Sequence, residues 1–490
     1  MNYTRKVAYN TAAQFIGKIA GFAISLVTIA ILFRFLGVEG LGKYTTVFAY
    51  VAFFTLFADL GLGWTLLREL SVSDDKEKVF RNIFTFRLVL GILVFSIGSI
   101  VVWLFHYPVD VKWAVAVLSA GFFLQSLNST VINIYLNNYR MDIATSAEVV
   151  GKAVILLVVY LVSINAGSLS AIMLAYVLGS LVNLIITWGF ASKFLKTGFA
   201  FDKVYWRYAF LQAFPIGVTL VFGYVYYKID SLMLSMMKGM VDVGIYGAPY
   251  KLLEVLQMFP ALFLGAAFSL ITKYATEKDE RIKPAFQKQY DFLVLLGAPV
   301  VVGVFVLAGP IISFVSGDNA AEFIHSSTIS FGSVPITSVT CLKILIFSVG
   351  INYITTLYNF MIVSLGKQKE MVWPTIGFAL FNVALNLALI PRFSYLGASI
   401  ATLLTETLVL VAVHRITNRN LRLPLQFANF FKIIFAALIM GVIIYFFYNY
   451  LSDNILLTVA VAIVCYGLLA LLLKIISKDI LKSFFKPKGS

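Results

Sequence analysis

The chain has 490 residues, of which 60% are hydrophobic and only 12% are charged, about half the charged share of a soluble globular protein. A soluble protein of this length would expose far more polar surface, so the composition nearly excludes that class. The net charge of +15 would suggest nucleic-acid binding in a soluble protein. In a membrane protein the positions of the charges must be known before they are interpreted.

Apolar stretches long enough to cross a bilayer recur along the whole chain. Such runs are longer and more continuous than the alternating strands of a membrane β-barrel, and they predict transmembrane helices instead. We therefore predict an all-α integral membrane protein with about 14 transmembrane helices. The predicted spans are 8–36, 43–67, 82–106, 112–136, 143–165, 168–191, 208–236, 243–270, 289–315, 333–363, 371–391, 395–414, 430–450 and 454–477.

The lysine and arginine residues between these spans predict the orientation. If the N-terminus is cytoplasmic, the cytoplasmic segments carry about 25 basic residues and the external loops about 4. The asymmetry recurs along the chain, so it supports an even number of spans with both termini in the cytoplasm. Most of the positive charge is then a topology signal, and nucleic-acid binding is not needed to explain it.

A short motif occurs twice, once in each half of the chain. Residues 37–44 and residues 239–246 both read G-x4-G-x-Y, and both lie between two predicted spans. Six spans separate the copies, which predicts two six-helix lobes related by a pseudo-twofold axis along the membrane normal. Chance is the alternative, because glycine and tyrosine are common at loop edges. The predicted organisation is an N-terminal lobe at 1–191, a cytoplasmic linker at 192–207, a C-terminal lobe at 208–418, and two additional spans with a basic tail at 419–490.

Fourteen spans in this arrangement resemble the multidrug/oligosaccharidyl-lipid/polysaccharide exporter superfamily. The local sequences are most similar to its polysaccharide (O-antigen type) flippase branch, and the similarity extends over about four-fifths of the chain. The similar stretches are 35–44, 58–62, 67–71, 228–234, 243–246, 251–254 and 396–402.

The resemblance implies a transporter, not an enzyme. It implies flipping of a polyprenyl-(pyro)phosphate-linked oligosaccharide across the cytoplasmic membrane of a prokaryote by alternating access, for cell-surface polysaccharide or glycan assembly. The expected partners are that lipid-linked oligosaccharide and membrane lipids. We expect a functional monomer, with association with glycan-assembly enzymes left open. No cofactor or metal is expected apart from a coupling Na⁺ or H⁺.

Basic residues within the predicted spans are the candidate contacts of an anionic head group. Burying a charge in a membrane is costly, so such residues usually face a cavity or a partner. Arginine and lysine both suit phosphate, and the excess of cations favours a pyrophosphate-linked lipid over an organic cation. Snorkelling to the interface remains an alternative for Arg87, and an intrahelical pair with Glu148 for Lys152. The candidate head-group residues are Lys18, Arg87, Lys152, Lys228, Lys251 and Lys343.

Carboxylates within the spans are the candidate sites of ion coupling. Lone buried carboxylates can bind Na⁺ or carry a proton. For Asp59, which has no base nearby in the sequence, a helix-packing role is an equal alternative. For Glu254, an ion pair with Lys251 three residues away is the alternative. The candidate coupling residues are Glu406, Glu254, Asp59 and Asp230.

Two other functions compete with the flippase. A drug/organic-cation antiporter of the same fold would need carboxylates in its cavity, and the excess of basic residues argues against it. A membrane-embedded glycan polymerase or ligase usually carries a large external loop. The largest external loop expected here, about residues 316–332, is short. No catalytic residue is therefore assigned.

Overall fold

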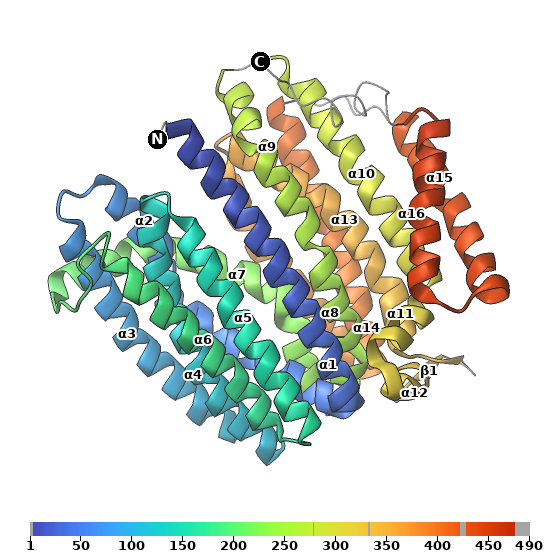
Figure 1. The fold of residues 1–490 in the computed structure, drawn as a ribbon, viewed down its shortest axis with the longest axis horizontal. Coiled ribbons are helices and arrows are strands. Elements are labelled where there is room, and N and C mark those ends of the chain that lie inside the picture. Colours follow the sequence, from blue (N-terminus) through green and yellow to red (C-terminus); the bar gives the residue numbers. More distant parts are fainter. Residues whose placement is uncertain (1–2, 278, 332–333, 422–427, 476–490) are drawn as a thin grey trace. The chain divides into compact units, whose positions relative to one another are not determined.

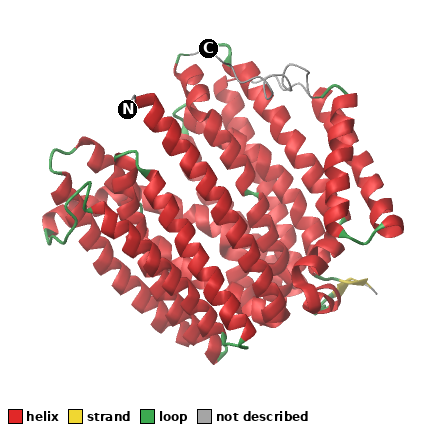
Figure 2. Cartoon of the chain, in the orientation of Figure 1, coloured by secondary structure: helices red, strands yellow, loops and turns green. Residues whose placement is uncertain are grey.

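The computed structural model describes residues 3–277, 279–331, 334–421 and 428–475. These residues form helices joined by short connections, apart from one small hairpin (Figure 2). The hairpin pairs β1 (Ser330–Phe331) with β2 (Val334–Pro335) in antiparallel register. The predicted all-α fold is confirmed.

The helices divide into two compact units, Met1–Gly244 and Ile245–Ser490, here called the first and second units. The first contains α1 (Tyr3–Asp59), α2 (Leu62–Val72), α3 (Lys76–Val101), α4 (Val109–Asn137), α5 (Met141–Ile164), α6 (Leu169–Ala191) and α7 (Lys203–Met237). Helix α8 (Met240–Leu256) contains the boundary. The second contains α9 (Met258–Thr276), α10 (Ile282–Val306), α11 (Ala308–Ser316), α12 (Ala320–His325), α13 (Ser338–Ser364), α14 (Val372–Leu421), α15 (Ala428–Phe446) and α16 (Ile455–Leu472).

The predicted spans map onto these helices with several breaks. Within the described residues, 10 helical segments are long and apolar enough to cross a membrane, or up to 11 with the bent helix α7. Two of them, α1 and α14, each contain two predicted spans, separated by non-helical residues at Gly37 and Ser394. The predicted span 243–270 corresponds to α8 and α9, and the predicted span 289–315 to α10 and α11.

The boundary between the units differs from the predicted one. The prediction assigned residues 208–236 to the second lobe, whereas α7 clusters with the first unit. The segment before α7 is bound to α3 in the same unit. The backbone N–H of Ala200 donates to Thr85 Oγ1 at 3.1 Å, and that of Asp202 donates to Asn82 Oδ1 at 3.0 Å. The segment expected as a linker is thus hydrogen-bonded to the first unit.

The two copies of the repeated motif meet inside the first unit. A Cβ on Gly42 would lie 1.8 Å from the carbonyl oxygen of Met240, and one on Gly244 would lie 1.9 Å from that of Val38. The contact is reciprocal, because Gly42 and Gly244 hold the same position in their motifs, as do Val38 and Met240. Only glycine permits so close a backbone approach. The repeated glycines therefore have a packing role that chance would not explain.

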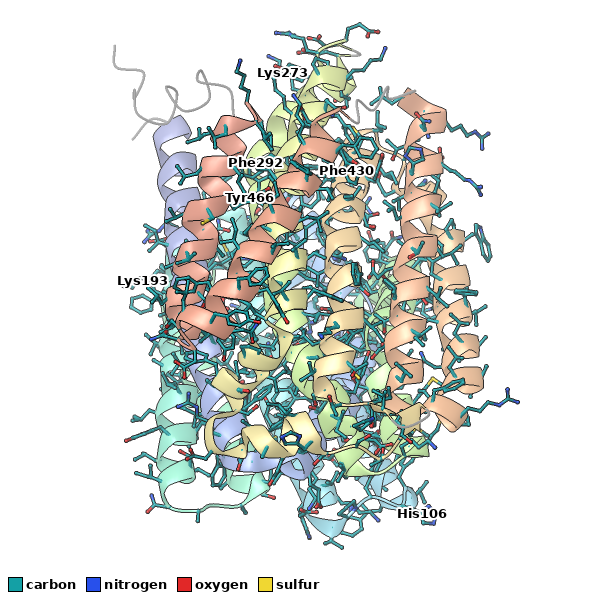
Figure 3. All side chains as sticks on the ribbon, turned by 90° about the vertical axis from the view of Figure 1, so that its right-hand side faces the viewer. His106, Lys193, Lys273, Phe292, Phe430 and Tyr466 are labelled. Atoms are coloured by element: carbon teal, nitrogen blue, oxygen red, sulfur yellow. The ribbon has the colours of Figure 1, made fainter. Side chains whose placement is uncertain are left out.

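The last two helices pack within the second unit. Leu307, Met440 and Ile444 form a small buried cluster between α10 and α15. Tyr466 of α16, labelled in Figure 3, donates a hydrogen bond to the carbonyl oxygen of Leu295 at 2.9 Å. Figure 1 shows α15 and α16 side by side at the C-terminal end of the described chain. Helices expected only as additions are thus anchored to α10.

Candidate functional site

A polar cavity of about 500 Å³ lies within the first unit. Residues of α1, α4, α5 and α6 line it, and the last three of these helices run side by side in Figure 1. Polar groups gather there although the surrounding helices are strongly apolar. The cavity's uncharged polar residues are Gln125, Asn128, Ser129, Ser180 and Asn183, and its aromatic residues are Phe48, Phe122 and Tyr176.

An ion pair borders this cavity. Lys152 Nζ lies 2.8 Å from Glu148 Oε1, and both side chains remain partly exposed. They are four residues apart on α5, so the predicted intrahelical pair is confirmed. The lysine also lies against α1, where a Cβ on Gly21 would be 3.1 Å from Nζ. The missing side chain at Gly21 gives the ammonium group room beside the cavity.

Lys18 lies on α1, on the N-terminal side of Gly21. It is exposed, and it is not among the described residues that line the polar cavity. The neighbouring Gly17 packs on α5, since a Cβ there would be 2.1 Å from Thr145 Cγ2. Lys18 therefore presents a charge on a helix fixed to α5, outside the cavity.

Arg87 and Asp59 form a buried ion pair that the sequence did not indicate. Arg87 donates to Ser126 Oγ and to Thr130 Oγ1, both at 3.0 Å, and it also donates to Asp59 Oδ1. Asp59 was expected to lack a nearby base. Because 28 residues separate the pair, no helical spacing could reveal it. With three partners in the protein, Arg87 is a packing residue in this structure, which differs from its expected role at a head group.

In the second unit, Lys251 and Glu254 form the other expected pair. Lys251 Nζ lies 3.1 Å from Glu254 Oε2, and the side chains are 15% and 24% exposed. The three-residue spacing on one helix predicts this contact, and the structure confirms it. The pair is more enclosed than Glu148–Lys152, so an ion-coupling role for Glu254 must be compatible with an occupied partner.

The remaining candidates lie in different environments. In the first unit, Asp230 is buried, and Lys228 is partly buried with Nζ 5.3 Å from the centre of the Tyr227 ring. In the second unit, Glu406 of α14 is buried. The adjacent Thr405 accepts a hydrogen bond from Asn382 Nδ2 at 3.1 Å, which joins the two limbs of α14.

An apolar groove of about 560 Å³ lies in the second unit, between α10, α13 and α15. Its described lining is apolar apart from a tyrosine, and includes Phe305, Phe347, Gly441 and Val442. The candidate cation Lys343 borders it, because its Nζ lies 5.4 Å from the centre of the Phe305 ring. Sequence reasoning missed this groove, since its walls come from helices that are far apart in the chain.

Comparisons with known proteins agree with this architecture. The family model described as "Polysaccharide biosynthesis protein" matches residues 4–275, and the MatE family model matches residues 215–388. A search of the curated proteins finds no match.

Several solved structures share the fold. The structure titled "Lipid II flippase MurJ, inward closed conformation" has a TM-score of 0.73 at 15% identity, covering 98% of this chain and 100% of that one. An inward-facing multidrug resistance MATE family transporter has a TM-score of 0.62 at 13% identity, covering 81% and 95%. A MOP superfamily transporter from Pyrococcus furiosus has a TM-score of 0.57 at 13% identity, covering 84% and 95%.

At these identities the solved structures establish the fold alone, that of multi-pass membrane transporters. The match of the first family model covers more than half of the chain. The chain therefore belongs to the polysaccharide biosynthesis protein family, within the flippase branch of the MOP superfamily.

Proposed function

We propose that this protein flips a polyprenyl-(pyro)phosphate-linked oligosaccharide across the cytoplasmic membrane by alternating access. The observation that carries the proposal is the polar cavity of about 500 Å³ enclosed by apolar helices of the first unit. Buried polar groups in a membrane are costly and usually mark a substrate path. Membership of the polysaccharide biosynthesis family makes a glycan the substrate class to expect.

The groove of the second unit supports a lipid-linked substrate. An apolar groove can hold a prenyl chain while the hydrophilic head group occupies polar surroundings. Lys343, which borders the groove through Phe305, is placed to contact a phosphate at the end of such a chain. Lys18, Lys228 and Lys251 are the other proposed head-group contacts. Arg87 and Lys152 are less available, since each already has a carboxylate partner.

Ion coupling is proposed at the buried carboxylates Glu406 and Asp230, with Na⁺ or H⁺ as the ion. We further propose a monomer in the cytoplasmic membrane of a prokaryote, with both termini cytoplasmic. The distribution of lysine and arginine supports this orientation.

Organic-cation antiport is the second candidate function. The match of the MatE model to residues 215–388 and the MATE transporters among the structural neighbours favour it. Such a protein would bind a cation through unpaired carboxylates. At Asp59, Glu148 and Glu254 the structure instead pairs each carboxylate with a basic side chain, which favours the flippase.

Flipping can be tested with purified protein in proteoliposomes. The substrate is the lipid-linked oligosaccharide pool extracted from the cells that supply the sequence, and a soluble glycosidase reports which leaflet holds it. Wild-type protein should move the substrate between leaflets. The double variant Lys18→Gln/Lys251→Met should lose most of this activity, because two cations of the proposed path are removed.

The matched control is Lys78→Gln/Lys367→Gln, which removes two cations paired with exposed carboxylates at helix ends. This control should retain wild-type flipping. Unchanged flipping in the Lys18/Lys251 variant would reject those residues as head-group contacts. Exchange of tetraphenylphosphonium for Na⁺ or H⁺, without any lipid movement, would reject the flippase and support the antiporter.

A further inference from the structure

We infer that the polar cavity of the first unit binds an uncharged sugar ring of the glycan and leaves the phosphate to other residues. The inference rests on the proposed flippase function and names the part of the substrate that this cavity recognises. Three properties of the lining lead to it: its charge balance, its free hydrogen-bonding capacity and its aromatic wall.

The charge balance argues against an ionic ligand. Among the described lining residues only Glu148 and Lys152 are charged, and they neutralise each other at 2.8 Å. A phosphate entering beside Lys152 would also meet the Glu148 carboxylate, and an organic cation beside Glu148 would meet the ammonium group. Either ion would have to compete with an existing pair. A neutral polar ligand avoids that cost and can hydrogen-bond to both groups.

The amides supply unused hydrogen-bonding capacity. Asn183 Oδ1 is buried and has no hydrogen-bond partner among the described residues, although its residue lines the cavity. A buried acceptor without a partner costs about 1–3 kcal/mol, so a ligand that donates to it gains binding energy. Gln125 is exposed to the cavity, and both its donors and its acceptor are of use to a ligand. Sugar hydroxyls both donate and accept, which matches this mixture.

An aromatic wall completes the site. Phe48 packs edge-on against Tyr176 at 4.8 Å and against Phe122 at 5.9 Å between ring centres. The Tyr176 hydroxyl is held by that of Tyr44 at 2.7 Å, which fixes the ring. Rigid aromatic faces suit the apolar C–H face of a pyranose, while amides bind its hydroxyls. A lipid chain would leave the amides unsatisfied, and a simple ion would make no use of the rings.

Glycines bring the cavity-lining helices close together. A Cβ on Gly151 would lie 2.8 Å from the carbonyl oxygen of Gly179, and one on Gly121 would lie 3.3 Å from the backbone nitrogen of Val177. All three glycines line the cavity. Because the helices touch through backbone, the amides are held at fixed separations, as recognition of a rigid ring requires.

The test is protection of an introduced cysteine from alkylation. Ser180→Cys is made in a full-length chain whose own Cys341 and Cys465 are replaced by alanine, so that the only thiol lies in the cavity. The control thiol is Ser163→Cys, which lies on α5 but is not among the described lining residues. Three probes are compared: oligosaccharides released from the lipid-linked pool by mild acid, inorganic pyrophosphate, and tetraphenylphosphonium.

We expect the released oligosaccharides alone to slow alkylation of the Ser180→Cys thiol, by at least about threefold at saturation, since occupied sites exclude the reagent. Adding Asn183→Ala should remove most of this protection. Asn165→Ala, an asparagine at the end of α5 outside the described lining, should not. The control thiol at position 163 should be unaffected by every probe.

Protection by pyrophosphate or by tetraphenylphosphonium instead of the oligosaccharides would overturn the inference, as would no protection by any probe. Equal protection in the Asn183→Ala variant would overturn the role of that amide. These outcomes are separate from the proposed function, because the wild-type flipping assay reports transport whatever this cavity binds. Flipping without oligosaccharide protection would retain the flippase and reject the sugar site.

Discussion

The cavity of the first unit and the groove of the second have similar volumes, about 500 and about 560 Å³, but opposite linings. The cavity combines amides, hydroxyls and an ion pair, whereas the groove is lined by aliphatic and aromatic side chains. One chain thus carries a surface for each half of an amphiphile. The difference teaches that the average apolarity of a membrane protein says little about an individual site.

The two regions also differ in how their helices are held. Buried hydrogen bonds and backbone contacts at glycines fix the first unit, as in the Arg87 network and the approach of Gly151 to Gly179. Around the groove, Gly441 meets only the side chains of Val302 and Val306. Polar and backbone contacts tolerate little displacement, while apolar side chains can rearrange. The three predictions below test this contrast.

The largest effect is expected from breaking the Asp59–Arg87 pair. Asp59→Ala leaves the buried guanidinium without its counter-charge, which should lower the free energy of unfolding by about 3 kcal/mol. Thermal unfolding in detergent measures it. Replacing both partners, in Asp59→Asn/Arg87→Met, should recover part of the loss. A loss no greater than that of Asp279→Ala, which removes the exposed partner of Arg281, would contradict the packing role.

An intermediate effect is expected from filling a glycine contact in the first unit. Gly179→Ala would place a Cβ 2.7 Å from the Gly151 carbonyl oxygen and 2.4 Å from Ile155 Cγ1, and should cost about 2 kcal/mol through strain. The matched substitution in the second unit, Gly441→Ala, meets Val302 Cγ1 at 2.5 Å, a methyl group that can turn away. It should cost less than about 1 kcal/mol. Equal losses would remove the proposed difference in rigidity.

The smallest effect on energy is expected from obstructing the groove. Val442→Trp fills part of it and should reduce the flipping rate of the lipid-linked oligosaccharide about tenfold, equivalent to about 1.4 kcal/mol. It should leave oligosaccharide protection in the first unit unchanged. The control is Val464→Trp, an exposed position on α16 outside the described groove. An equal reduction in the control variant would show a general effect of bulk at the surface.

Local spacing along a helix was the most informative signal for the site. The pairs Glu148–Lys152 and Lys251–Glu254 follow from separations of four and three residues, and both are present. The partners of Asp59 and Arg87 could not be predicted, because α1, α3 and α4 come together only in the folded unit. The boundary between the units was also outside the reach of hydropathy, since α7 joins the first unit through packing.

The sequence by itself determined that this is an all-helical membrane transporter of a polysaccharide flippase family. Hydrophobicity integrates over about 20 residues per span, so it survives errors at individual positions. Only the tertiary structure decided which intramembrane charges neutralise each other and where a polar cavity and an apolar groove open. Those outcomes depend on contacts between helices distant in the chain, which no local period records.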